Sequence, residues 1–354
     1  MKTITWCYRL FKSIHKTRLK TLGILIDALI QGSQLGVCAL GRSIRSGTTI
    51  KHKIKQIDRF LSNENVKVEE FLSLFFPVVC GSRKRVTIAV DCTNVKERVV
   101  FCAAVVEQGR CLPVYWRIVE DTALYCHNTE EERFFEGLSD LIPDDYEVII
   151  LADRGFHRSP LTEKLKSLGF YYVIRQPCVP LVYSEKYKGR LRDLPLRMGK
   201  VVDLGKCILT RVRRYTTRVV ALRDFKQKQT WYVSTNLYDL DPSKIVKLYS
   251  IRFRIEETFR DVKGVRGGWH LKRIGIKSVK RLSRLLLIAV VTYFFLSLMG
   301  IAAERQGIHK GLVQCTSKRR VISLFQVGKL TFYNLRIGLP GLLSLLKYLI
   351  VDVT

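Results

Sequence analysis

The spacing of apolar positions divides the chain into two helical ends and a β-rich middle. In residues 1–75 the apolar positions recur at helical spacing, interrupted at Gly32 and Gly36, so this region is expected to be helical. From residue 85 the period changes to short β-branched runs bounded by turn residues, which predict strands. Residues 272–354 return to a helical pattern that is rich in basic residues.

The first part of the middle region predicts an alternation of strands and helices. Three consecutive apolar runs, with EQGR as the second turn, predict a meander. They are followed by a helix, a buried strand that ends at Asp153, a helix with Pro160 in its first turn and Gly169 just past its end, and a further strand. The expected order is therefore β-β-β-α-β-α-β, over residues 85–91, 98–109, 110–120, 129–142, 145–153, 160–169 and 170–175.

The remaining middle residues change character. Two basic runs predict a hairpin, and WYVSTNL predicts a further strand, so this part is expected to be a β-rich insertion. A helix should then begin near Pro242. The expected domains are a helical DNA-binding domain, the first part of an α/β core, the insertion, the last helix of the core and a helical C-terminal region, over residues 1–75, 76–176, 177–240, 241–271 and 272–354.

The basic N-terminal region favours contact with DNA. Two short helices around a Gly/Ser turn, followed by a basic amphipathic helix, suit a helix-turn-helix-like DNA binder. The alternative is an ordinary helical bundle with a solvated basic face. The basic residues of the amphipathic helix, which alternate with apolar ones, are Lys51, Lys53, Lys55 and Arg59.

One apolar segment admits two interpretations. Residues 285–303 carry no charge and are long enough to span a bilayer. No second segment matches them, and they contain Thr292, Tyr293 and Ser297. A buried core helix is therefore favoured over a membrane span, and no membrane partner is expected.

The charge balance limits the classes of partner. Lys and Arg number 61 against 31 Asp and Glu, a formal net charge of +30 that is spread along the 354 residues. Such self-repulsion suits a polyanionic partner, first nucleic acid and second an anionic membrane surface. The ten cysteines form no CxxC pair and no zinc-ligand spacing, so they are expected to be reduced and mostly buried, as at Cys80, Cys102 and Cys207.

Residues 249–264 combine a helical pattern with aligned charges. At about 100° per residue, Tyr249, Arg252, Glu256 and Lys263 share one narrow stripe, whereas Glu257 lies about 100° away from Glu256. A solvated helix would scatter its charges or pair them at four-residue spacing. This stripe instead aligns one acid with two bases and an aromatic hydroxyl.

Two aspartates complete a candidate metal site. Asp91 and Asp153 each end an apolar strand, where functional sites often form at the edge of a sheet. Together with Glu256 they make three carboxylates in a basic protein, and carboxylates that lie close together raise each other's pKa unless a cation intervenes. Mg²⁺ takes such oxygen ligands, and two ions can activate a hydroxyl and stabilise the leaving oxygen of a phosphodiester. Taken singly, each aspartate could equally be a turn or capping residue.

The signature Y-x2-R-x3-E-x6-K, met by Tyr249, Arg252, Glu256 and Lys263, resembles that of a large family of bacterial insertion-sequence transposases with a DDE triad. The segments VDCTNV and LADRGF resemble the two aspartate regions of this family, and WYVSTNL resembles the segment with its base-stacking tryptophan. The segments IEETFRDVK and 285–320 look closest to the hairpin-forming, cut-and-paste branch. The resemblance covers nearly the whole chain.

The resemblance implies an α/β fold, namely a ribonuclease-H-like (retroviral-integrase-like) core with a β-rich insertion and flanking helical domains. It implies that Asp91, Asp153 and Glu256 are catalytic and bind two Mg²⁺ or Mn²⁺ ions. It also implies that the residues binding the transposon-end DNA include Tyr249, Arg252 and Lys263, and that Trp231 stacks on a flipped base. The alternative for Trp231 is a core aromatic residue on a strand.

The expected function is that of a bacterial, cytoplasmic, nucleoid-associated DNA transposase. It would cut at the terminal inverted repeats of its element, pass through a hairpin and join the 3′-hydroxyls to target DNA. It is expected to act as a homodimer in a synaptic complex. The rival interpretations are a metal-dependent nuclease or resolvase on the same fold, a catalytically decayed protein that only occupies the ends, and a membrane protein.

Overall fold

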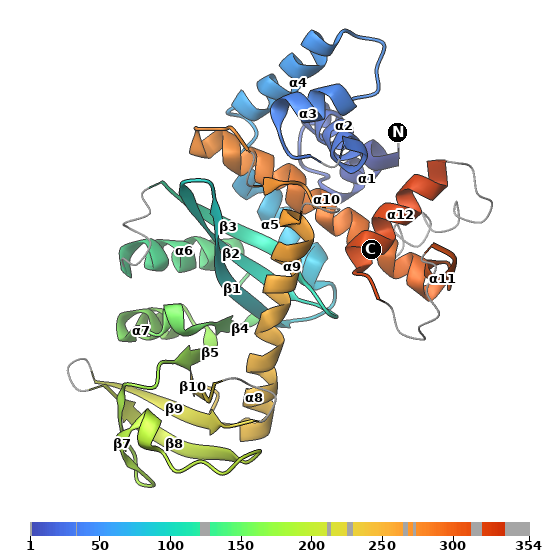
Figure 1. The fold of residues 1–354 in the computed structure, drawn as a ribbon. Coiled ribbons are helices and arrows are strands. Elements are labelled where there is room, and N and C mark those ends of the chain that lie inside the picture. The colour runs from blue at the N-terminus through green and yellow to red at the C-terminus, as the bar shows by residue number, and fades with distance from the viewer. Residues whose placement is uncertain are drawn as a thin grey trace.

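One ten-stranded sheet runs from the centre of the molecule to the bottom of the view, and the helices of the two ends of the chain lie above it and to its right (Figure 1). The computed structural model describes residues 2–336 apart from 33, 121–127, 211–213, 225–228, 265–267, 272–273 and 313–320. The strand order is β3-β2-β1-β4-β5-β10-β9-β8-β6-β7. The sheet therefore has two halves, which meet where β5 pairs with β10.

The first half of the sheet has the predicted order of elements. Its strands are β1 (Arg85–Val95), β2 (Arg98–Val106), β3 (Cys111–Val119), β4 (Glu147–Ala152) and β5 (Tyr171–Gln176), with helices α6 (Asn128–Leu141) and α7 (Ser159–Ser167) between β3, β4 and β5. The strands β1, β4 and β5 are parallel, whereas β2 and β3 add to the other side of β1 as an antiparallel meander. Helical crossovers before β4 and β5 permit the parallel pairing. The β-β-β-α-β-α-β prediction is thus confirmed.

The second half of the sheet comes from the predicted insertion. Its strands are β6 (Leu181–Tyr183), β7 (Lys188–Arg190), β8 (Val201–Leu209), β9 (Tyr215–Leu222) and β10 (Trp231–Thr235), with a 3₁₀ turn, η3, at Leu191–Asp193. The predicted hairpin is the antiparallel pair β8–β9. The insertion does not form a separate sheet, because β10 pairs antiparallel with β5 and so continues the first half.

The N-terminal region is helical, as predicted. Its helices are α1 (Lys2–Leu10), α2 (Lys16–Gly32), α3 (Val37–Ser43), α4 (Ile50–Ser62) and α5 (Val68–Cys80). The axes of α2 and α3 differ by 92°, as in a helix-turn-helix arrangement. The domain boundary expected between residues 75 and 76 falls inside α5, which continues unbroken to Cys80.

The apolar segment 285–303 lies within α10 (Val279–Arg305). This helix is long and apolar enough to cross a membrane, yet 83% of its most apolar window is buried inside the protein. It packs between the N-terminal helices, the sheet and α12 (Leu324–Arg336), which agrees with the predicted core helix. A short helix, α11, spans His309–Leu312. The expectations for residues 337–354 lie outside the described residues.

Two glycines allow α10 and α12 to pack closely. A Cβ on Gly300 of α10 would lie 1.9 Å from the carbonyl oxygen of Leu324, and a Cβ on Gly328 of α12 would lie 1.8 Å from that of Leu296. Neither position could hold a side chain unless the helices moved apart, since backbone atoms cannot yield as a flexible side chain does. The pair of glycines therefore sets the distance between these helices.

The predicted signature helix consists of three consecutive helical pieces. These are α8 (Pro242–Ser250), a 3₁₀ turn, η4 (Ile251–Phe253), and α9 (Arg254–Lys263). The carboxylate of Asp241 caps α8 by accepting a hydrogen bond from the Ser243 amide, and Pro242 follows in the first turn, so the helix begins where predicted. The pieces continue one another along the side of the sheet (Figure 1).

Candidate active site

Asp91 and Asp153 lie side by side at one end of the central strands. The parallel pairing of β1 with β4 ends at Val90 and Ala152, and the two aspartates are the next residues in each strand direction. One detail of the prediction was wrong: β1 does not end at Asp91 but continues to Val95, because β2 keeps pairing with it. Asp91 therefore lies at the point where β1 loses one neighbour and keeps the other.

Asp153 also has a local structural role. It precedes the 3₁₀ turn η2 (Arg154–Phe156), and its Oδ1 accepts a hydrogen bond of 2.8 Å from the Gly155 amide. The capping alternative for this residue is thus realised. Its second carboxylate oxygen makes no contact in this cap, so capping and ligand binding can coexist on the one side chain.

Arg252 joins the helix to the sheet. Its guanidinium donates to Oε1 of Glu256 at 2.7 Å and lies 3.5 Å from Oδ2 of Asp91. The side chain is only 5% exposed and lies over the ring of Phe253, 4.6 Å from its centre. A buried guanidinium between two carboxylates neutralises charge that the site would otherwise have to tolerate.

The acidity of Asp91 is perturbed by its surroundings. Burial raises its pKa from 3.8 to about 6, against the lowering effects of Arg252 and of the Cys92 amide, and Asp153 and Glu256 add smaller upward contributions. The contributions of Asp153 and Glu256 show that all three carboxylates share one electrostatic site. A carboxyl group of this kind would gain from a bound cation.

The three carboxylates do not yet form a ready set of metal ligands. Within the described residues, no group of three or more His, Cys, Asp or Glu side chains is placed to hold a metal ion. Arg252 contacts Asp91 and Glu256 where a shared cation would have to reach them. The structure therefore brings the predicted triad to one site, with an arginine in contact with two of its members.

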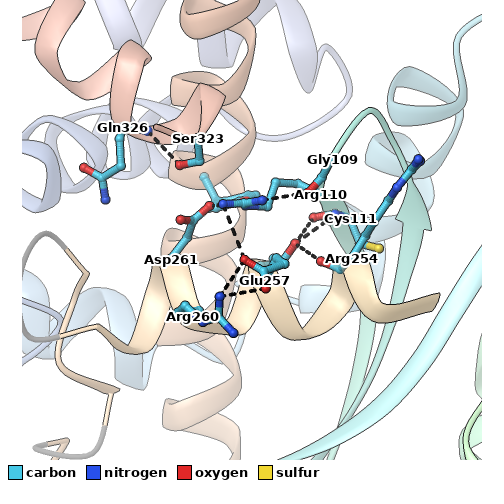
Figure 2. Close-up of polar contacts among 11 residues, drawn as sticks. Gly109, Arg110, Cys111, Arg254, Glu257, Arg260, Asp261, Ser323 and Gln326 are labelled. Atoms are coloured by element: carbon cyan, nitrogen blue, oxygen red, sulfur yellow. Dashed lines mark hydrogen bonds and ion pairs between the residues drawn. The ribbon is translucent and has the colours of Figure 1, made fainter. Parts of the chain in front are cut away.

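The adjacent glutamates have different surroundings, as the helical angle predicted. Glu256 faces Arg252 and Asp91, and its side chain is 47% exposed. Glu257 instead pairs with Arg260 at 2.7 Å and lies 3.8 Å from Arg110, on the other flank of α9 (Figure 2). Only Glu256 is placed to act together with the aspartates.

The aromatic residues of the predicted DNA contact are buried. Trp231, at the start of β10, is 4% exposed and packs edge-on against Tyr249, with their ring centres 4.9 Å apart. Tyr249 is fully buried, and its hydroxyl makes no hydrogen bond with the described residues. Trp231 thus occupies the core position that was its alternative interpretation, while its stacking on a base stays a prediction.

The remaining basic residues of the prediction are more accessible. Lys263, at the end of α9, is partly exposed and lies over Phe259, 5.2 Å from the ring centre. On α4 the apolar positions Ile57 and Phe60 are buried, which confirms an amphipathic helix. The basic residues of α4 lie on its solvent-facing side: Lys51, Lys55 and Arg59 are exposed and Lys53 is partly exposed.

Three residues of α9 that the sequence prediction did not include, Arg254, Thr258 and Asp261, hold this helix in place. Thr258 is fully buried and exchanges hydrogen bonds with the backbone of Cys111, and Asp261 binds Arg110. The only sequence signal for them is spacing, since residues 254, 258 and 261 share one face of a helix. Their partners lie well over a hundred residues earlier in the chain and could not be identified from the helix itself.

Part of the chain that contains this site matches a known family. Residues 117–292, just under half of the chain, match a family model described as "Transposase DDE domain". This part of the chain is therefore similar to a transposase DDE domain. The match runs from β3 to α10 and so includes Asp153 and Glu256, whereas Asp91 precedes it. The predicted transposase function is confirmed at this level, and the mixed α/β fold is consistent with it.

The chain is similar to the piggyBac transposase in a cryo-EM structure of its synaptic complex with hairpin DNA, with a TM-score of 0.47 and 11% identical residues over 100% of this chain and 85% of that one. A likeness at this level assigns no residue role. No curated protein matches the chain.

Proposed function

We propose that this DDE transposase cleaves the ends of its own element and joins the resulting 3′-hydroxyls to target DNA, through a hairpin at the element's ends. All steps are phosphoryl transfers, so one site can perform them if the attacking hydroxyl changes. The chain would belong to the bacterial insertion-sequence family with the Y-R-E-K signature, with a ribonuclease-H-like core in β1–β5. It would act in the bacterial cytoplasm, at the nucleoid.

The convergence of Asp91, Asp153 and Glu256 carries this proposal. Two of them follow the last paired residues of adjacent parallel strands, and the third is linked to Asp91 through Arg252. Ligands and reactions of open α/β sheets are found at this carboxyl end of the strands. A purely structural network would not need three carboxylates at one place, where burial opposes the charge of Asp91.

The donor chemistry of the site fits an oxygen-preferring divalent ion, and DDE domains generally use such ions. Asp91 and Asp153 would hold Mg²⁺ or Mn²⁺ from the sheet, and Glu256 would hold it from α9, with two ions as our proposal. When bound, they would stabilise the negative charge on the transferred phosphoryl group. Arg252 competes with a cation for the oxygens of Asp91 and Glu256, and it already meets part of their need for positive charge.

DNA binding follows from the charge of the chain. The net charge of +30 suits a polyanion, and the basic side of α4 offers contacts to phosphates away from the carboxylates. Arg252 and Tyr249 would reach the cleaved strand only if the DNA displaces them from their buried positions. Likewise, Trp231 would stack on a flipped base only after leaving Tyr249 and Phe253. We propose that end DNA binds to a homodimer, in which these changes occur.

The test uses the DNA that flanks the gene. A matched pair of short inverted repeats would supply the substrate, and purified protein is incubated with a labelled end, Mg²⁺ and a target plasmid. Nicked, hairpinned and plasmid-joined products on a denaturing gel would support the proposal, and Asp91→Asn and Asp153→Asn should give none of them while still binding the end. Nicking without joining would instead favour the nuclease, and binding without any cleavage the decayed end-binding protein.

A further inference from the structure

The flank of α9 opposite the candidate ligand is tied to the turn between β2 and β3. Figure 2 shows Glu257 and Asp261 of α9 facing Arg110, which follows Gly109 in this turn. Nε of Arg110 donates to Oδ2 of Asp261 at 2.7 Å, and its NH2 lies 3.8 Å from Oε2 of Glu257. The Asp261 side chain is 10% exposed, so this ion pair is largely shielded from solvent.

Two more contacts bind the same flank to the same turn. The Thr258 hydroxyl accepts a hydrogen bond from the Cys111 amide at 2.8 Å and lies 2.9 Å from the Cys111 carbonyl oxygen. NH1 of Arg254 donates to the carbonyl oxygen of Glu107 at 2.7 Å. The turn therefore holds α9 at three successive levels along the helix, through Arg254, Thr258 and Asp261.

Asp261 also connects this flank to the buried helix α10. The Tyr293 hydroxyl donates to the same Oδ2 atom, at 3.3 Å. Tyr293 is almost fully buried, so it fixes the carboxylate from the side of the core. With Arg110 on one side and Tyr293 on the other, the Asp261 carboxylate has a defined position and holds the C-terminal part of α9 in turn.

Among the residues that the structure describes, the flank that carries Glu256 has no comparable support. Glu256 contacts Arg252, and its side chain is 47% exposed. At about 100° per residue, Glu256 lies about 140° around the helix from Asp261. A rotation of α9 about its axis would thus move the Glu256 carboxylate away from the strand ends, and the contacts to the β2–β3 turn oppose that rotation.

We propose that Arg110, Asp261 and Thr258 are positioning residues, which set the rotation of α9 and thereby hold Glu256 toward Asp91 and Asp153. None of the three contacts Asp91 or Asp153 in the described part of the chain, so they act on the site through α9 alone. Once a cation or DNA draws Arg252 away from Glu256, these contacts are what keeps the helix in phase. This inference rests on the proposed function, because it assigns Glu256 the role of a metal ligand.

The test measures Mn²⁺ binding to the DNA-free protein, by the loss of the electron paramagnetic resonance signal of free Mn²⁺. Asp261→Asn keeps the size of the side chain but loses the charge that holds Arg110, and we expect Mn²⁺ affinity to fall by about tenfold, the lower range for residues that orient metal ligands. Glu256→Gln gives the loss expected when the ligand itself is removed. Arg260→Gln is the matched control, because Arg260 pairs with Glu257 on the same helix but is 73% exposed.

Arg110→Lys supplies a second variant, in case Asp261→Asn does not fold. It keeps the positive charge but cannot reproduce the Nε contact, so we expect a weaker loss of Mn²⁺ affinity in the same direction. Unchanged Mn²⁺ affinity in folded Asp261→Asn and Arg110→Lys, even with lowered thermal stability, would overturn the inference and leave the proposed function standing. Wild-type protein that binds no Mn²⁺ with or without end DNA would overturn the proposed function itself.

Discussion

The two flanks of α9 differ in how firmly their side chains are held. On one flank Glu256 is half exposed and contacts a single arginine, which in turn reaches Asp91. On the other flank Thr258 is fully buried, and Asp261 is held from both the β2–β3 turn and α10. The first flank has groups that can exchange partners, whereas the second has groups that cannot do so without breaking buried contacts.

This difference shows how a helix can be both fixed and reactive. A carboxylate that must receive a cation cannot be locked by many protein contacts, because each contact would compete with the cation. Stability must then come from elsewhere on the same helix, and here it comes from hydrogen bonds and an ion pair shielded from water. The adjacent Glu256 and Glu257 differ in their contacts because they lie on these different flanks.

The largest expected effect is a difference between the two glutamates when each is replaced by glutamine. Glu256→Gln should abolish DNA cleavage and leave end binding in place, because the amide removes a proposed metal ligand but no phosphate contact. Glu257→Gln should keep cleavage near the wild-type rate, since its partners are Arg260 and Arg110. The measurement is cleavage of labelled end DNA by both variants. An active Glu256→Gln variant together with an inactive Glu257→Gln variant would show that the ligand is Glu257, on the other flank of α9.

Asp91 lies on β1 and contacts the Glu256 flank of α9 through Arg252. Its pKa measures how strongly burial opposes the charge of this carboxylate. Its pKa of about 6 in the folded chain exceeds its ordinary 3.8, so between these values the folded state holds a proton that the unfolded state has lost. The contribution of Asp91 to stability is therefore present below pH 3.8 and is lost as the pH rises through 6, by about 3 kcal/mol at 1.36 kcal/mol per pKa unit.

Urea unfolding on both sides of pH 6, without divalent ions, measures this effect. Asp91→Asn has no such titration, so the free energy of unfolding of the variant should rise relative to wild type as the pH increases through 6. Other groups titrate in both proteins and cancel in the difference. Parallel pH profiles for the two proteins would show that Asp91 is not strained in the folded chain.

The smallest expected effect is a loss of stability on the flank of α9 that carries Thr258 and Asp261. Thr258→Val keeps the shape of the side chain but leaves the buried Cys111 amide without its partner, which should lower the free energy of unfolding by about 1–3 kcal/mol. Thr331→Val is the control, because the buried Thr331 hydroxyl donates to the Val327 carbonyl one turn back in α12, its one hydrogen-bond partner in the described part of the chain. Chemical denaturation compares them, and equal losses would mean that Thr258 does not tie α9 to the sheet.

The sequence alone determined much of the candidate site. The strand and helix order of the first half of the sheet, the β8–β9 hairpin and the start of α8 follow from local periodicity and from capping residues. The separation of Glu256 from Glu257 follows from helical geometry, since the angle between consecutive residues does not depend on what surrounds the helix. These features depend on interactions between residues that are close together in the sequence, so they can be predicted from the sequence alone.

Only the tertiary structure decided which groups face one another. Arg110 and Asp261 lie 151 positions apart in the chain, and Arg252 and Asp91 lie 161 apart, so no periodicity could pair them. The burial of Trp231 and Tyr249, and the joining of the insertion to the core sheet through β5 and β10, likewise depend on how the elements pack. Packing is settled by the shapes and charges of surfaces that meet only when the chain has folded, which is why the support of Glu256 could be seen only there.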